Sequence, residues 1–116
     1  MRALLNNQDI RPLVTLFIPS YNHTRYIRET IESIINQSYK NIELLIIDDG
    51  STDNSIEVIE SLSGICCERF IRYEFISSKH QGLASSLNQA LDWSNGKYFA
   101  MLASDDAYYP FKIADQ

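Results

Sequence analysis

The sequence has 116 residues, of which 45% are hydrophobic and 22% charged, and its formal net charge is −5. This length fits a single domain over residues 1–116, and the apolar share is large enough to build a core. The acidic balance argues against nucleic acid as a partner, because phosphate binding depends on clusters of Lys and Arg that the sequence lacks.

No apolar run approaches the length needed to span a bilayer, and the opening "MRALLNNQDIRP" is too short and polar for a signal peptide. The two cysteines, Cys66 and Cys67, are neighbours, which is a poor geometry for a disulfide, and two ligands alone make a poor zinc site. We therefore expect reduced thiols and a cytosolic location.

The first part of the chain predicts a strand followed by a helix. The run Leu13–Pro19 is short, apolar and closed by proline, which is typical of a buried strand. From Thr24 the apolar period becomes helical, with Asn22 or Thr24 as the N-cap. Four isoleucines share one face of this helix: Ile27, Ile31, Ile34 and Ile35.

The middle of the chain repeats this order. Ile42–Asp48 predicts a second buried strand, and residues 51–53 offer caps for a helix. The apolar face of that helix carries Ile56, Ile59 and Leu62. The run Arg69–Ile76 alternates less cleanly and predicts a third strand near an edge of the sheet.

The last part predicts a helix and a fourth strand. Leu83, Leu87, Ala90 and Leu91 mark the helix, Gly96 is expected as its C-cap, and Lys97–Ser104 is the strand. The whole order predicts an α/β fold, with a mostly parallel four-stranded, Rossmann-like sheet and helices on both faces.

Three polar clusters follow predicted strands: "PSYN" at 19–22, "DDGSTD" at 48–53 and "SDD" at 104–106. Ligands of open parallel sheets bind beyond the carboxyl ends of the strands, so these clusters are expected to converge on one site. Each has a structural alternative: turn and capping chemistry for 48–53, a packed rim aromatic for Tyr21, and a helix cap for Asp105 and Asp106.

The chemistry of these residues suggests a ligand. The adjacent carboxylates of Asp105 and Asp106 can hold Mg²⁺ or Mn²⁺, which bridges to substrate phosphates, and Tyr21 can stack on a nucleobase. A metal on a diphosphate also stabilises the negative charge of a leaving group. Together they predict a site for a diphosphate-activated donor, while His23 and His80 are read as surface histidines.

Two long segments carry a family resemblance. "TLFIPSYNHTRYIRETIESIINQSYKNIELLIIDDGSTDNS" resembles the opening of a family 2 glycosyltransferase with a GT-A fold. "HQGLASSLNQALDWSNGKYFAMLASDDAYYP" is similar to the segment that carries the DXD-like metal motif of that family. The resemblance runs from about Pro12 to Pro110, and one departure is Ala103, where the family often has another acid.

The resemblance implies a nucleotide-sugar donor, most commonly a UDP-sugar, and roles for matching positions. Pro19 and Tyr21 would border the base, and Asp49 would contact it with Asp48 alongside. Asp105 would lie near the ribose and the metal, and Asp106 would be the principal ligand of Mn²⁺ or Mg²⁺. Gly82 and Asn88 match recurrent family positions, which we interpret as structural, with a possible donor-side contact.

A larger departure is length, because family members continue for about another hundred residues that form the acceptor side. The resemblance places the catalytic base for inverting transfer in that part, so no catalytic residue is assigned here. We expect the donor-binding half of an enzyme, self-associating through its exposed face. The complete enzyme could lie at the inner face of a membrane, with a glycan, lipid or protein as acceptor.

The sequence also bears on three other functions. One is a non-catalytic module that binds nucleotide-sugars or assembles with other chains. A phospho-receiver domain needs an acidic pair after the first strand, which "PSYN" does not supply. A dinucleotide-binding oxidoreductase needs a glycine-rich first turn, and "PSYNHTR" contains no glycine.

Overall fold

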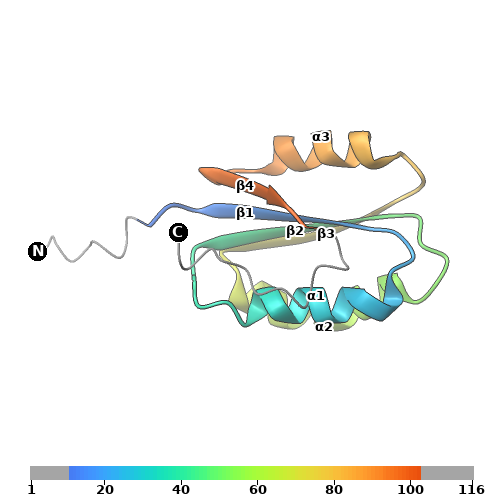
Figure 1. Ribbon diagram of the computed structural model, residues 1–116, viewed down its shortest axis with the longest axis horizontal. Coiled ribbons are helices and arrows are strands. Elements are labelled where there is room, and N and C mark those ends of the chain that lie inside the picture. The colour runs from blue at the N-terminus through green and yellow to red at the C-terminus, as the bar shows by residue number, and fades with distance from the viewer. Residues whose placement is uncertain (1–10, 103–116) are drawn as a thin grey trace, which may run out of the picture.

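The computed structural model describes residues 11–102, which form a four-stranded sheet flanked by three helices (Figure 1). The strand order is β3-β2-β1-β4, and each pair of neighbours is parallel. The predicted α/β architecture is therefore confirmed. In chain order the elements are β1 Val14–Ser20, α1 Thr24–Ile35, β2 Ile42–Asp49, α2 Ser55–Arg69, β3 Arg72–Ser78, α3 Leu83–Trp93 and β4 Tyr98–Met101.

Helices cover both faces of the sheet. Figure 1 shows α1 and α2 on one face and α3 on the other. Successive side chains of a strand point to opposite faces, so Leu16 and Ile18 pack in the core beneath α1 and α2, whereas Phe17 packs in the smaller core beneath α3. The predicted apolar face of α1 is buried, with Ile27 and Ile31 fully enclosed.

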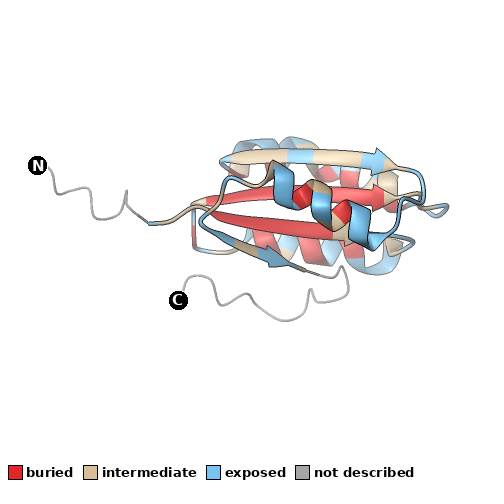
Figure 2. Ribbon diagram, turned by 90° about the horizontal axis from the view of Figure 1, so that it is seen from above, coloured by how far each residue is buried: buried red, intermediate tan, exposed pale blue. Residues whose placement is uncertain are grey.

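The central and edge strands differ in burial, as Figure 2 shows. Strands β1 and β2 are buried almost throughout, which explains why their sequences are apolar without alternation. Strand β3 is half-buried and lies at one edge, as predicted, and β4 forms the other edge of the described sheet. Pro19 is tolerated in β1 because the β1–β4 pairing ends two residues earlier, where Phe17 faces Met101.

The predicted start of the third strand at Arg69 is wrong. Helix α2 continues through Arg69, and β3 begins only at Arg72. The Arg69 guanidinium explains the difference, because it donates to three backbone carbonyls of the α1–β2 connection. Its Nε donates to Ile35 at 2.8 Å, and its Nη2 donates to Gln37 and Tyr39 at 2.9 Å.

Gly96 does not end α3, as the sequence pattern suggested. The helix ends at Trp93 with Ser94 as its C-cap, and Gly96 lies against β1. The Gly96 amide donates to Thr15 Oγ1 at 3.0 Å, and a Cβ added to Gly96 would lie only 2.4 Å from that oxygen. The glycine is required here because two backbones approach closely.

Several large apolar side chains are exposed on α3 and β4. Leu83 and Leu91 are 55% and 49% exposed, and Tyr98 and Met101 are 56% and 48% exposed. The leucines that signalled a helix in the sequence therefore do not all face the sheet, where Ser86 and Ala90 of α3 are buried instead. Over residues 11–102, no helix combines the length and hydrophobicity that crossing a membrane requires.

Candidate functional site

The parallel strands bring the ends of β1, β2 and β3 to one edge of the sheet. In register, Ser20 lies opposite Asp48, and Asp48 lies opposite Ser77. The three loops that follow these strands therefore start side by side. They span residues 21–23, 50–54 and 79–82.

Asp48 organises this edge from the inside. Its side chain is fully buried and accepts hydrogen bonds from Ser20 Oγ at 3.0 Å, Ser51 Oγ at 2.6 Å and the Ser51 amide at 2.8 Å. These bonds tie the end of β1 to the loop after β2. Both carboxylate oxygens of Asp48 are therefore used within the protein.

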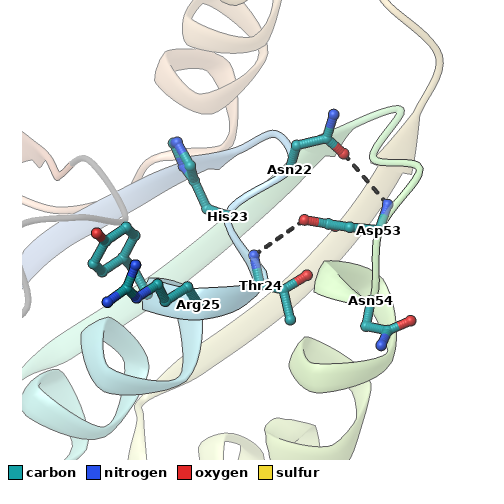
Figure 3. Close-up of a pocket in the computed structure, with 7 residues that line it drawn as sticks. Asn22, His23, Thr24, Arg25, Asp53 and Asn54 are labelled. Carbon is teal, nitrogen blue, oxygen red and sulfur yellow. Dashed lines mark hydrogen bonds between the residues drawn. The ribbon is translucent and has the colours of Figure 1, made fainter.

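Asn22 links the first loop to the second. Its backbone has a positive φ of 52°, and its Oδ1 accepts from the Thr52 backbone amide at 2.8 Å. The same oxygen accepts from the Asp53 backbone amide at 3.4 Å (Figure 3). The backbone amide of Asn22 donates to Ser51 Oγ at 2.8 Å. Contacts in both directions fix the two loops to each other.

Asp53 caps two helices at once, which corrects the predicted capping by Asn22 or Thr24. The first residue of α1 is Thr24, and its amide donates to Asp53 Oδ2 at 3.2 Å (Figure 3). The Ser55 amide, at the start of α2, donates to Asp53 Oδ1 at 2.9 Å. Desolvation alone would raise the pKa of Asp53, but the hydrogen bonds from Ser55 and Thr24 together outweigh it and hold the pKa well below the usual range.

Asp49 fixes the third loop. Its Oδ1 accepts from the Gln81 amide at 2.7 Å and from Ser78 Oγ at 3.4 Å, and its Oδ2 accepts from the Gly82 amide at 3.0 Å. Gly82 has a positive φ of 89° and is the N-cap residue of α3. The carboxylate thus sits at the positive end of the α3 dipole, where a negative charge is stabilised.

Tyr21 and His80 form an aromatic contact above these loops. Tyr21 is 44% exposed, and its ring centroid lies 5.4 Å from that of His80, with 59° between the ring planes. Gly50 lies beneath His80, and a Cβ on Gly50 would come within 3.4 Å of the His80 amide nitrogen. Two exposed rings therefore lie on the loops that the carboxylates of Asp48 and Asp49 hold.

A hollow of about 440 Å³ lies beside this edge, at the start of α1 (Figure 3). It shares Asn22 and Asp53 with the loops described above, but among residues 11–102 none of the site residues predicted from the sequence lines it. The amides of His23 and Thr24 are already bonded to Ser55 and Asp53, so they are not open donors for an anion. The remaining lining residues are Arg25, Tyr26 and Asn54.

The structure brings four of the predicted site residues to this edge: Pro19, Tyr21, Asp48 and Asp49. The predicted metal residues Asp105 and Asp106 lie outside the described residues. Within residues 11–102, no group of three metal-ligating side chains occurs. The described chain reaches the carboxyl edge again at the end of β4, where the Leu102 amide donates to the Phe17 carbonyl at 2.8 Å.

Sequence reasoning missed the roles of Asn22, Asp53 and His80 in joining the loops. Asn22 and Asp53 were recognisable as capping residues from their side-chain type. Their actual partners lie 29 to 31 residues away in the sequence, and the local pattern does not indicate them. His80 had no pattern signal, because its position depends on a positive φ of 40° in a loop. Asn88 is exposed on α3, and Gly82 has the structural role that was expected for it.

Three comparisons place this geometry among known proteins. A family model described as "Glycosyl transferase family 2" matches residues 15–116. An uncharacterised glycosyltransferase of Rickettsia prowazekii is 39% identical over 105 residues, which cover 90% of this chain and 31% of that protein. A hyaluronan synthase of Pasteurella multocida is 39% identical over 99 residues, covering 85% of this chain and 10% of the synthase.

Among solved structures, the fold is similar to a mannosyltransferase of Pyrobaculum calidifontis, determined in complex with GDP-Man and Mn²⁺. The TM-score is 0.75 and the identity 25%, and the match covers 84% of this chain and 29% of the other. The chain thus spans about a third or less of the length of each of these relatives.

Proposed function

The chain belongs to glycosyl transferase family 2, and from this premise we propose that its carboxyl edge binds the nucleotide of a nucleotide-diphospho-sugar donor. The observation that carries the proposal is the convergence of Tyr21, Asp48 and Asp49 at the edge where open parallel sheets bind ligands. The family match spans residues 15–116, which include every described strand residue except Val14, so the site lies within the matched segment.

In this proposal Tyr21 stacks on the nucleobase, with Pro19 at the border of the base. The Tyr21 ring is half-exposed, so one face is accessible to a flat ligand. Stacking of a base on an aromatic ring contributes about 1–3 kcal/mol to affinity.

Asp48 and Asp49 have different parts in the proposed site. Asp48 is buried with both oxygens used, which supports a role in holding the loops rather than in touching the base. Asp49 is only half-buried, and its Oδ2 accepts one hydrogen bond among the described residues, from Gly82. A carboxylate oxygen accepts two hydrogen bonds, so Oδ2 can also accept an N–H of the base.

A divalent cation, Mn²⁺ or Mg²⁺, completes the proposed site through Asp106 and Asp105. Adjacent carboxylates supply the oxygen ligands that these hard cations prefer. Mn²⁺ in the similar mannosyltransferase structure supports this choice. When bound, the cation stabilises negative charge on the leaving nucleoside diphosphate.

The reaction we propose for the whole protein is inverting transfer of the sugar to a hydroxyl of a glycan, lipid or protein. The base that deprotonates that hydroxyl is assigned to no residue of this sequence. The donor is a UDP-sugar or a GDP-sugar, because UDP is the family's commonest nucleotide and GDP-Man accompanies the similar mannosyltransferase.

Calorimetric titration of the chain with UDP and with GDP, each with and without Mn²⁺, tests the donor site. We expect one nucleotide to bind in a Mn²⁺-dependent manner and Asp106→Asn to abolish that dependence. The matched control is Asp92→Asn, the same substitution at an exposed position of α3, which should bind like the wild type. Absence of binding by either nucleotide in either condition would refute the proposal.

A further inference from the structure

We propose that His80 is a positioning residue of the donor site, which holds the ring of Tyr21 in the orientation that stacks on the base. This inference rests on the proposed function above and assigns a role to the loop between β3 and α3. It concerns a contact between two loops separated by about 60 residues of sequence.

The ring geometry supports a specific contact. The centroids of Tyr21 and His80 are 5.4 Å apart and the planes are tilted by 59°. Aromatic pairs favour tilted arrangements with centroid distances of about 4.5–7 Å. A base between two rings would need them to be about 7 Å apart, because each stacking contact takes about 3.5 Å. The base must therefore use the face of Tyr21 that His80 does not occupy.

The backbone next to His80 is held by hydrogen bonds. The Asp49 carboxylate binds the amides of the two residues that follow, Gln81 and Gly82. On the other side, His80 lies against Gly50, since a Cβ there would be at contact distance, 3.4–3.6 Å, from the His80 amide nitrogen and two ring atoms. The backbone that carries the ring is thus held by contacts that do not involve Tyr21, and the ring itself lies beside Gly50.

Tyr21 depends on such a neighbour more than a core residue would. It lies in the loop after β1 and is 44% exposed, so the core does not restrict its ring. A ring that turns freely loses rotamer freedom when a base stacks on it, and this ordering weakens binding. By restricting Tyr21 before the nucleotide arrives, His80 reduces that loss.

The test is a double-mutant cycle on the full chain, with His80→Asn, Tyr21→Leu and the two combined. Asparagine tolerates the positive φ of 40° at this position, so His80→Asn removes the ring without straining the backbone. The readout is the dissociation constant of the nucleotide that the wild type binds, with Mn²⁺ present. We expect His80→Asn to weaken binding about threefold in the wild-type background and not at all in the Tyr21→Leu background.

The control is Asp92→Asn, at an exposed position of α3 outside the three loops, which should bind like the wild type. Wild-type affinity in His80→Asn, or equal weakening in both Tyr21 backgrounds, would overturn the positioning role and leave the donor site standing. Equal weakening by Asp92→Asn would also overturn it. A wild-type chain that binds neither UDP nor GDP would refute the proposed function together with this inference.

Discussion

Glu43 and Arg72 form an ion pair at the amino ends of β2 and β3, with 3.1 Å between Oε1 and Nε. The Glu43 side chain is 2% exposed and also accepts hydrogen bonds from Thr15 Oγ1 at 2.6 Å and from the Asn95 amide at 2.7 Å. The guanidinium of Arg72 lies 3.7 Å from the centre of the Trp93 ring. This network joins three strands to the end of α3, at the opposite end of the sheet from the candidate site.

Replacing Glu43 by alanine should therefore lower the free energy of unfolding by about 3 kcal/mol, because it leaves buried donors and a half-exposed cation without their partner. Urea denaturation measures the change. Glu60→Ala, at an exposed position of α2, should stay within about 0.5 kcal/mol of the wild type. Equal stability of the two variants would contradict the buried network.

Two glycine-to-alanine substitutions should change the free energy of unfolding in opposite directions. Gly96→Ala places a Cβ 2.4 Å from Thr15 Oγ1 and 2.7 Å from the Thr15 amide nitrogen, so we expect destabilisation of about 1–3 kcal/mol. Gly64→Ala lies within α2, where an added Cβ meets no atom of the described chain within 4 Å apart from the surrounding helix backbone, and should stabilise by about 0.5–1 kcal/mol. Thermal unfolding of both variants checks the pair, and a Gly96→Ala variant as stable as the wild type would be inconsistent with the close approach.

The stability of the folded protein should depend on pH through Asp53. Its pKa is lowered on folding, so its charged form stabilises the native state above the ordinary value of 3.8, and this stabilisation is lost as the pH falls below that value. We expect Asp53→Asn to be less stable than the wild type at neutral pH and the difference to shrink below about pH 4. Urea denaturation across that range measures it, and a pH-independent difference would argue against the charged cap.

The two thiols should differ in reactivity. Cys66 is buried, and burial, with a smaller contribution from neighbouring Cys67, raises its pKa to about 12, whereas Cys67 is exposed. Because the thiolate is the reactive form, Cys67 should react rapidly with a thiol reagent in the native state, and Cys66 only on unfolding. Mass spectrometry of the labelled chain, with Cys67→Ser as the control, distinguishes the sites. Rapid native labelling of Cys67→Ser would refute the assignment.

The sequence was sufficient for the sheet because its signals are local. The unbroken apolar runs of β1 and β2 have no other stable placement than the middle of a covered sheet, and the spacing of Ile27 and Ile31 selects the buried face of α1. The error at Arg69 had a non-local cause, since its partners lie in the connection after α1. Gly96 was misread for the same reason, because its neighbour Thr15 is 81 residues away.

In the candidate site, too, the local signals were predictable and the contacts between distant loops were not. That Tyr21 and Asp49 would share one edge followed from the parallel order of the strands alone. The strand order did not predict which loop each side chain would bind. The contacts of Asp49 with Gln81 and of Asn22 with Thr52 depend on loop conformations with positive φ values. Asp105 and Asp106 remain predictions of the sequence.

The hydrogen bonds between the loops have a consequence for the thermodynamics of ligand binding. Asn22, Asp48 and Asp49 hold the three loops through bonds that exist before any ligand arrives. A ligand meeting a rigid surface does not have to order it, so little conformational entropy is lost on association. The heat-capacity change of nucleotide binding should then contain no contribution from folding of these three loops.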